Sequence, residues 1–316
     1  MNSFGEKSTA SDVLASKDLS GKTVFITGGN SGLGLETGRA MAAQGAHVVL
    51  AGRDQRKLDD AVSAIKADSP EAKVETIICD LGALDSVRSC GDEARSRFDA
   101  IDILINNAGV MATPRGTTSD GFETQFGTNH VGHFLLTKQL MPLVEKGQDK
   151  RIINLSSRGH HMAPANLDDP NFETSDYNEW LSYGQSKTAN VLFTVGLEKR
   201  FADKGVHSYA VHPGGIQTNL SRHLSQEQTD ALVSRVVASD PGFAWKTIPQ
   251  GAATQCWAAT ADELGGQGGL YCEDCHVAEI DDTSSMGGVR SYALDTANAD
   301  RLWSISEEMV GENFTA

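Results

Sequence analysis

Short apolar runs alternate with longer amphipathic segments over the first two-thirds of the chain. The first run, Thr23 to Thr27, is rich in β-branched and aromatic residues, which is typical of a buried strand. Further strands are predicted over His47 to Ala51, Val74 to Cys79, Ile101 to Ile105, Arg151 to Leu155 and Val206 to Val211. Helices are predicted over Leu35 to Gln44, from a cap at Asp54 to about Ala67, and over Asp85 to Phe98, Gly121 to Val144 and Tyr183 to Phe201. This alternation indicates an α/β fold, a Rossmann-type, doubly wound parallel sheet.

Polar and glycine-rich residues follow directly after successive strands. These residues are Gly28 to Gly34, Arg53, Asp80, Asn106 to Gly109, Ser156 with Ser157, and Pro213 to Thr218. In an open parallel sheet, ligands bind at the carboxyl ends of the strands. The sequence therefore predicts one site along this edge.

The glycine-rich turn comes between the first strand and the first long helix. Gly28, Gly32 and Gly34 permit a tight turn and a close approach of a pyrophosphate to the backbone, and the helix N-terminus supplies N–H donors. Their spacing, Gly-x-x-x-Gly-x-Gly, differs from the Gly-x-Gly-x-x-Gly of the usual fingerprint, so a plain turn is the alternative. The strand, turn, helix and next strand together favour a dinucleotide site.

The end of the second predicted strand bears on which dinucleotide binds. An acid there accepts a hydrogen bond from the ribose 2′-OH of NAD, whereas an arginine accommodates the 2′-phosphate of NADP. Asp54 lies 20 residues beyond Gly34, but the strand is predicted to end at Ala51, with Gly52 and Arg53 following. This arrangement favours NADP(H) over NAD(H), with Arg53 on the phosphate; the alternative is that Arg53 is a solvated loop residue.

Tyr183 and Lys187 are spaced to share one face of a helix. A nearby ammonium favours phenolate, so Lys187 is expected to lower the Tyr183 pKa from its usual value of about 10. A tyrosine with a lowered pKa can pass a proton near neutral pH. The alternative is a half-buried tyrosine beside a solvated lysine.

The composition narrows the class of protein. The 316 residues carry a formal net charge of −15, with a pI of about 5.0, which argues against nucleic acid and against an anionic membrane surface as partners. No apolar run approaches 18 residues, so no transmembrane helix is predicted. Residues 1–20 form a polar leader without a signal-peptide core, in which Asp12 to Leu14 is expected to make a helical turn packed on a single domain over 21–316. The five cysteines favour a reduced, cytoplasmic protein.

Together these segments resemble the short-chain dehydrogenase/reductase family from about Leu19 to Thr218, and more loosely beyond. The resemblance rests on Thr27 to Gly34, Cys79-Asp80-Leu81, Asn106 to Gly109, Asn129, Ser157, Tyr183 with Lys187, and Pro213-Gly214. A retinol-dehydrogenase-like, WW-domain-oxidoreductase-like branch is indicated by Thr128 to Phe134, Asn190 to Phe193 and Leu270 to Cys275.

The resemblance implies a role for each matching residue. Tyr183 is the acid/base, Lys187 lowers its pKa and binds the nicotinamide ribose, Ser157 rather than Ser156 bonds the substrate oxygen, and Asn129 helps to hold a water behind Lys187. The implied cofactor-binding residues are Gly28, Asn30, Ser31, Gly32, Leu33, Gly34, Arg53, Asp80, Leu81, Asn107, Ala108, Gly109, Tyr183, Lys187, Pro213, Gly214, Ile216 and Thr218. The alternatives are a helix kink at Asn129, a cap at Asp80 and a turn residue at Ser157.

The remaining segments are expected to enclose the substrate. Arg158 to Ser182 is predicted to be a loop that walls the site, and 217–246 a C-terminal substrate lid. The lid residues Leu220, Leu224, Leu232, Val233, Val236 and Val237 face either a lipophilic substrate or the ordinary core. No metal site is expected from the adjacent His160 and His161 or from Cys272 and Cys275, because a third ligand or a second cysteine pair is missing.

The predicted function is an NADP(H)-dependent interconversion of a small lipophilic alcohol and its ketone or aldehyde. A possible homo-oligomer follows from the resemblance. One alternative is a non-catalytic dinucleotide-binding redox sensor, which does not need the acid/base set of Tyr183, Lys187, Ser157 and Asn129. A light-driven pyrrole reductase shares the Thr-Asn-His motif, but Thr188-Ala189-Asn190 stands where that family has a cysteine.

Overall fold

The structure is a computed structural model that describes residues 4–239, 242 and 244–315. Within these residues one eight-stranded sheet has the strand order β3-β2-β1-β4-β5-β6-β7-β8. The strands are β1 (Thr23–Thr27), β2 (His47–Gly52), β3 (Val74–Ile78), β4 (Ile103–Asn106), β5 (Arg151–Leu155), β6 (His207–His212), β7 (Leu270–Glu273) and β8 (His276–Val277). All neighbours pair in parallel except β7 and β8. The doubly wound α/β fold is confirmed.

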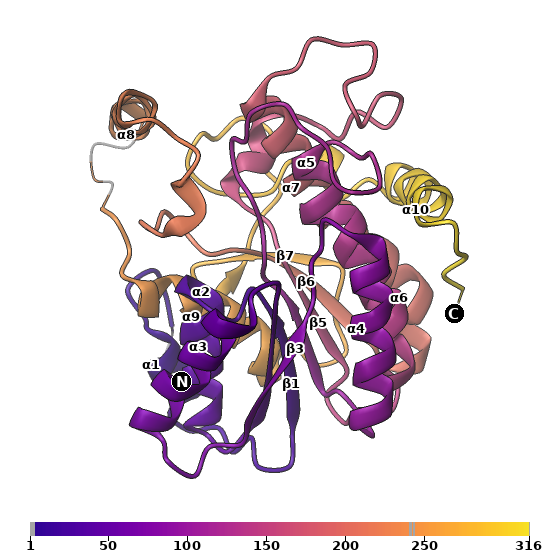
Figure 1. Cartoon of the computed structure of the whole chain (residues 1–316). Helices are drawn as coiled ribbons and strands as arrows, with labels where there is room; N and C mark the ends of the chain where they lie inside the picture. Colours follow the sequence, from indigo (N-terminus) through magenta and orange to yellow (C-terminus); the bar gives the residue numbers. More distant parts are fainter. Residues whose placement is uncertain (1–3, 240–241, 243, 316) are drawn as a thin grey trace.

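Two layers of helices cover the two faces of the sheet (Figure 1). Along β1, Phe25 faces one layer, while Val24 and Ile26 face the other, so that the strand is buried from Val24 to Thr27. The first layer contains α4 (Leu84–Arg97), α6 (Gly132–Val144), α7 (Glu179–Phe201) and α10 (Thr296–Val310). The second contains α1 (Ala10–Leu14), α2 (Gly32–Ala42), α3 (Gln55–Asp68) and α9 (Ile248–Thr260).

The N-terminal leader is part of the packed structure. Thr9 caps α1 in a capping box with Asp12, and Ala10, Val13 and Leu14 are buried in the cluster that includes α9. The helical turn expected at Asp12 to Leu14 is confirmed.

The long helix expected from Gly121 to Val144 has a break in its hydrogen-bond pattern. A short helix, α5 (Thr124–Phe126), is followed by a π-helical turn over Gly127–Val131 and then by α6. Such π turns are rare and often occur at functional sites. Asn129 lies inside this turn.

The C-terminal third adds the elements around the site. The helix α8 (Gln226–Ser239) lies in the predicted lid and stands away from the sheet in Figure 1. Residues 240, 241 and 243 of that lid lie outside the described residues. In the described part of the chain, none of the helices combines the length and the hydropathy needed to span a bilayer.

Candidate active site

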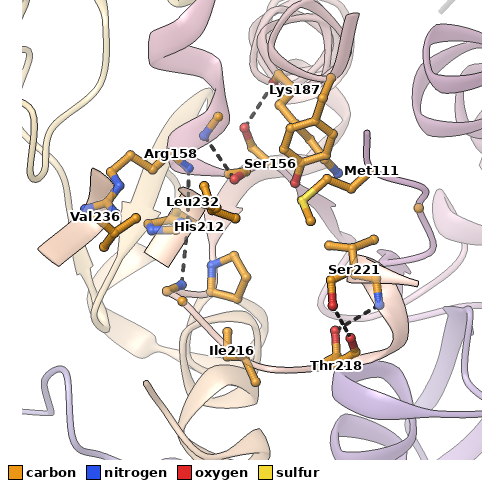
Figure 2. A pocket seen from close by; sticks show the side chains of 18 of the residues that line it. Met111, Ser156, Arg158, Lys187, His212, Ile216, Thr218, Ser221, Leu232 and Val236 are labelled. Atoms are coloured by element: carbon orange, nitrogen blue, oxygen red, sulfur yellow. Dashed lines mark hydrogen bonds between the residues drawn. The ribbon is translucent and has the colours of Figure 1, made fainter. Parts of the chain in front are cut away.

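A cavity of about 450 Å³ lies at the carboxyl ends of β4, β5 and β6 (Figure 2). The site expected at this edge of the sheet is therefore present as a pocket that is partly open to solvent. Of the residues predicted to bind cofactor or substrate, those that line it are Leu33, Asn107, Gly109, Ser157, Tyr183, Lys187, Pro213, Gly214, Ile216 and Thr218. Asn129 and the other predicted cofactor-binding residues do not line this cavity.

Tyr183 and Lys187 lie one turn apart on α7, and only 4% of each residue is exposed. Asn178 caps the helix by accepting from the N–H groups of Trp180 and Leu181, which starts α7 before Tyr183. The Lys187 Nζ lies 5.6 Å from the centre of the Tyr183 ring and donates to the backbone oxygen of Leu155 over 3.0 Å. The alternative of a solvated lysine is excluded.

The lowered pKa expected for Tyr183 is wrong for this structure. Burial raises the Tyr183 pKa to about 12 because the phenolate loses its hydration, and a hydrogen bond with the Ser157 side chain offsets only part of this. Burial also lowers the Lys187 pKa to about 8. Loss of hydration on burial is the largest cause of both pKa shifts.

The two serines after β5 have different partners. The buried Ser156 Oγ donates to the backbone oxygen of Lys187 over 3.0 Å, which ties β5 to α7. The Ser157 Oγ accepts from the N–H of Gly159 over 3.0 Å and is less buried. This arrangement keeps the Ser156 hydroxyl occupied and leaves Ser157 as the serine beside Tyr183.

Gly159 is a site residue that the sequence analysis missed. A Cβ atom at Gly159 would lie 2.7 Å from Cε1 of Tyr183 and 3.3 Å from the Ser157 Oγ. Real Cβ atoms do not approach other atoms so closely, so only glycine lets the Tyr183 ring lie against this backbone. Its position two residues after Ser157 is the only local signal in the sequence.

Asn129 lies behind the cavity wall rather than on it. Its Oδ1 accepts from the N–H of Val110 over 2.8 Å, and its Nδ2 donates to the Val110 oxygen and to the Ser186 Oγ, each over 2.9 Å. A Cβ at Gly109 would lie 3.2 Å from the Asn129 Oδ1 and 3.6 Å from the Lys187 Nζ. Asn129 thus fixes the segment that separates it from Lys187.

His133 is a second residue that the sequence analysis did not single out. Its Nδ1 is 2.9 Å from the Asn129 backbone oxygen, which only accepts, so Nδ1 carries the hydrogen. Burial lowers the His133 pKa to about 4, so the neutral ring uses Nε2 to accept from the Thr27 hydroxyl at 2.9 Å. The Thr27 Oγ1 in turn accepts the N–H groups of Asn107 and Ala108. This chain of bonds joins β1, β4 and the π turn; its signal was the i, i+4 spacing from Asn129.

The glycine-rich turn fits the pyrophosphate of a dinucleotide. Gly28 and Gly32 have positive φ angles of 65° and 55°, and a Cβ at Gly34 would lie 2.5 Å from the Gly28 oxygen. The helix α2 begins at Gly32, and the side chain of Ser31 makes no cap hydrogen bond. N–H groups at this helix end are therefore available to an anion next to the cavity.

The carboxyl end of β2 is the place where the sequence was expected to distinguish NADP from NAD. The strand β2 ends at Gly52, so the exposed Arg53 is the first residue beyond it, and no ion pair of Arg53 is found within the described residues. A Cβ at Gly52 would lie 3.4 Å from the Asn30 Oδ1, which places Asn30 of the glycine-rich turn beside this strand end. Asp54 caps α3 by accepting from the Lys57 N–H over 3.2 Å.

Two further predicted cofactor residues have structural roles of their own. The Asp80 Oδ1 accepts from the Gly82 N–H over 2.9 Å, so this side chain does cap a turn. The Leu81 side chain is buried in the core, and its backbone packs against Gly132. Neither residue lines the cavity.

The lid residues face the cavity rather than the protein core. Leu220, Leu224, Leu232, Val233 and Val236 line it, whereas Val237 does not and is 45% exposed. Within the part of α8 whose side chains are described, none is fully buried. The segment Arg158 to Ser182 also contributes to the wall, through Arg158, His161, Met162 and Trp180.

The histidine and cysteine pairs make other contacts. The His160 Nδ1 donates to the Ser157 oxygen over 2.8 Å, and the His161 Nε2 donates to the Gly288 oxygen over 2.9 Å. Cys272 and Cys275 are free and buried, and burial raises the pKa of both thiols. Among the side chains that the structure describes, no three His, Cys, Asp or Glu residues gather as a metal would require.

The chain is similar in sequence to known dehydrogenases. The family model described as short chain dehydrogenase matches residues 22–229. The chain is 39% identical over 320 residues to the short-chain dehydrogenase TIC 32 B, chloroplastic, of Brassica napus, covering 97% of this chain and 94% of that protein. It is 39% identical over 293 residues to human retinol dehydrogenase 12, covering 93% of this chain and 87% of that protein.

Solved structures show the same fold. An uncharacterised protein from Mycobacterium paratuberculosis matches with a TM-score of 0.73 and 34% identity, covering 98% of this chain and 99% of that chain. An actinorhodin polyketide ketoreductase crystallised with NADPH matches with a TM-score of 0.62 at 22% identity, covering 80% and 95% of the two chains. The second likeness concerns the fold alone.

Proposed function

Since the chain belongs to the short-chain dehydrogenase/reductase family, in its retinol-dehydrogenase-like branch, we propose that this oxidoreductase uses NADP(H) to interconvert a lipophilic alcohol and its ketone or aldehyde. The observation that carries the proposal is the cavity itself. Ser157, Tyr183 and Lys187 line it together with the apolar residues of the lid. An apolar carbonyl compound fits between them.

The proposed mechanism assigns the proton and the charge to this chain's residues. A bound nicotinamide supplies or accepts the hydride. As negative charge develops on the carbonyl oxygen, the Ser157 hydroxyl donates a hydrogen bond to it and the Tyr183 hydroxyl gives up its proton. Lys187, held on the Leu155 oxygen behind the tyrosine, stabilises the phenolate that remains. Asn129 is proposed to hold a water that returns the proton.

The dinucleotide is proposed to lie along the carboxyl edge of the sheet. Gly28, Asn30, Ser31, Gly32, Leu33 and Gly34 would surround the pyrophosphate; Arg53 would bind the 2′-phosphate; and the remaining contacts would come from Asp80, Leu81, Asn107, Ala108, Gly109, Pro213, Gly214, Ile216 and Thr218. The Arg53 guanidinium, which forms no ion pair with the residues that the structure describes, supports the preference for NADP(H), because a doubly charged phosphate suits it as a partner.

Oxidation of NADPH across a panel of ketones and aldehydes tests the reaction. We expect turnover of apolar members and a loss of about 100-fold or more in Tyr183→Phe, with NADPH binding retained. A Tyr183→Phe variant that turns over as fast as the parent would exclude this mechanism. Binding of NADPH without turnover of any compound would favour the redox sensor.

The cofactor preference has its own test. Arg53→Gln should raise KM for NADPH about tenfold and leave KM for NADH unchanged, because only NADPH carries the 2′-phosphate. Arg56→Gln, on the exposed side of α3, is the matched control. A parent enzyme with a clear preference for NADH refutes the role of Arg53.

Cytoplasmic location and assembly into a dimer or tetramer belong to the same proposal. The five free, buried cysteines support a reducing compartment. Sedimentation of the full chain measures the oligomeric state.

A further inference from the structure

One end of the cavity is polar and basic. Figure 2 shows Arg158 and His212 together with Leu232 and Val236 on one side of the pocket, and Met111 on the other. Arg290 also lines the cavity. The proposed reaction uses none of these polar groups, because the carbonyl oxygen is assigned to Ser157 and Tyr183.

The hydrogen bonds of His212 fix where its ring hydrogen lies. The Nδ1 accepts from the backbone N–H of Arg158 over 3.2 Å and from that of Gly214 over 3.4 Å. An atom that accepts two N–H groups carries no hydrogen itself. Burial and the nearby Arg158 and Lys246 lower the His212 pKa well below its usual range, so the ring is neutral and its one hydrogen sits on Nε2.

The Nε2–H of His212 is therefore an unused donor. No partner for Nε2 is found within the described residues, and this atom is not among the buried polar atoms that lack one. The ring is partly exposed, and the surface it exposes lines the cavity. A group that enters this end of the cavity can accept the hydrogen.

The guanidinium groups of the two arginines donate hydrogen bonds to backbone oxygens. The Arg158 guanidinium donates to the Met286 oxygen over 3.4 Å, and that of Arg290 donates to the Asp281 and Ser284 oxygens over 2.5 and 2.7 Å. These partners are neutral backbone carbonyls, and neither arginine forms an ion pair within the described residues.

Three carboxylates act electrostatically on the arginines: Glu273 on Arg158, and Asp281 and Asp282 on Arg290. The Glu273 carboxylate accepts from the Gly288 N–H over 2.7 Å, and burial raises its pKa. The Asp281 carboxylate is bonded to Thr283 and Ser284. The Asp282 carboxylate accepts from the Ser291 N–H over 2.8 Å, so all three carboxylates have other hydrogen-bond partners.

We propose that the Arg158 and His212 end of the cavity binds a carboxylate carried by the substrate away from its reacting carbonyl, so that apolar oxo acids are the preferred substrates. The proposal rests on the carbonyl reduction proposed above. The two carboxylate oxygens suit two donors, the Arg158 guanidinium and the His212 Nε2–H. The apolar part of the molecule then lies against Leu232 and Val236 of the lid.

The test compares medium-chain aldehydes that end in a carboxylate with their methyl esters, using NADPH. We expect the parent enzyme to prefer the acid by about tenfold or more in kcat/KM, since a hydrogen bond to a charged group contributes this much. Arg158→Gln should raise KM for the acid and leave the ester unchanged. The hydrogen bond from residue 158 to the His212 Nδ1 is kept in this variant, because the backbone N–H donates it. Arg56→Gln is the charge-matched control.

Two replacements of His212 separate its two nitrogens. His212→Asn keeps an acceptor near the Nδ1 position but lacks the cavity donor, so the preference for the acid should fall. His212→Gln places an amide N–H near the Nε2 position and should restore part of that preference. NADPH binding, followed by fluorescence, checks that both variants are folded.

The possible results distinguish a failure of the carboxylate site from a failure of the proposed carbonyl reduction. Equal use of acid and ester by the parent enzyme overturns the inference, while turnover of the ester still supports carbonyl reduction. An equal loss for acid and ester in His212→Asn also overturns the donor role, since it indicates only a structural one. Absence of turnover for every compound contradicts the proposed function and this inference together.

Discussion

The two walls of the cavity are built in opposite ways. On α7, every residue from Ser182 to Leu197 is buried. Hydrogen bonds to β5 and to the π turn hold the part of this helix that carries Tyr183 and Lys187. On α8, no described side chain is fully buried, and the partly buried Leu232, Val233 and Val236 line the cavity. The first wall is positioned by the protein, whereas the second gains its burial from what the cavity holds.

This contrast separates the effects of mutations. Changes on the α7 side should alter positioning and stability, because they disturb packed groups. Changes on the α8 side should alter substrate affinity with little effect on folding. Four changes test this division, beginning with the largest expected effect.

Gly159→Ala probes the positioning of the tyrosine. The added Cβ meets the Tyr183 ring at 2.7 Å, so the ring must move. A misplacement of about 1 Å costs about 100-fold in rate, so kcat should fall by this factor while NADPH binding is kept. Gly5→Ala is the control, because its Cβ meets nothing within 4 Å. An unchanged kcat in Gly159→Ala would show that the ring position is not constrained here.

Val233→Asp probes the lid. A carboxylate facing the cavity should lower kcat/KM for apolar ketones about tenfold or more, since burying an apolar side chain is worth about 1.5–3 kcal/mol. Leu224→Asp should act in the same way. The free energy of unfolding should change by about 0.5 kcal/mol or less.

Val237→Asp is the control for the lid on the same helix, because Val237 is exposed and does not line the cavity. Equal kinetics in Val233→Asp and Val237→Asp would remove the lid from substrate binding. A large loss of stability in Val233→Asp would place that residue in the core after all.

His133→Phe probes the bonds behind the α7 wall. The replacement leaves the Thr27 hydroxyl and the Asn129 oxygen without their partner in a buried setting. We expect a loss of about 2 kcal/mol in the free energy of unfolding, measured in urea. His133→Gln should recover part of it. Equal stability of His133→Phe and the parent would contradict the assigned bonds.

Lys187→Met probes the cost of burying the ammonium. Burial lowers the folded-state pKa of Lys187 to about 8 from 10.5. Between these values the unfolded chain keeps a proton that the folded chain has released, so stability rises with pH. From pH 7 to 9 the parent should gain about 1 kcal/mol relative to Lys187→Met. A constant difference between the two proteins over this range would show that Lys187 is not desolvated.

The order of elements was readable from the sequence because the sheet is buried on both faces. A strand such as β1 then appears as an unbroken apolar run, and the chemistry after each strand end meets at one edge. The shared face of Tyr183 and Lys187 followed from helix geometry alone. The apolar pattern of each strand and the spacing of Tyr183 and Lys187 both depend only on residues close together in the sequence.

What could not be predicted depends on contacts between distant segments. The depth at which Tyr183 is buried sets the direction of its pKa shift, and the i, i+4 spacing carries no information about depth. The clash that requires Gly159 involves a ring 24 residues away in the chain, and the tautomer of His212 depends on the N–H of Arg158. The sequence pattern alone also left open whether Leu232 faced the core or the cavity.

A crystal structure with NADPH bound would show directly whether Tyr183 faces the hydride-bearing carbon of the nicotinamide. We expect the nicotinamide ring in the cavity, near Ile216 and Thr218, with room for one carbonyl group between its hydride-bearing carbon and the Tyr183 hydroxyl. If the nicotinamide ring lies elsewhere, or if protein shields the Tyr183 hydroxyl from it, Tyr183 is not the acid/base of this reaction.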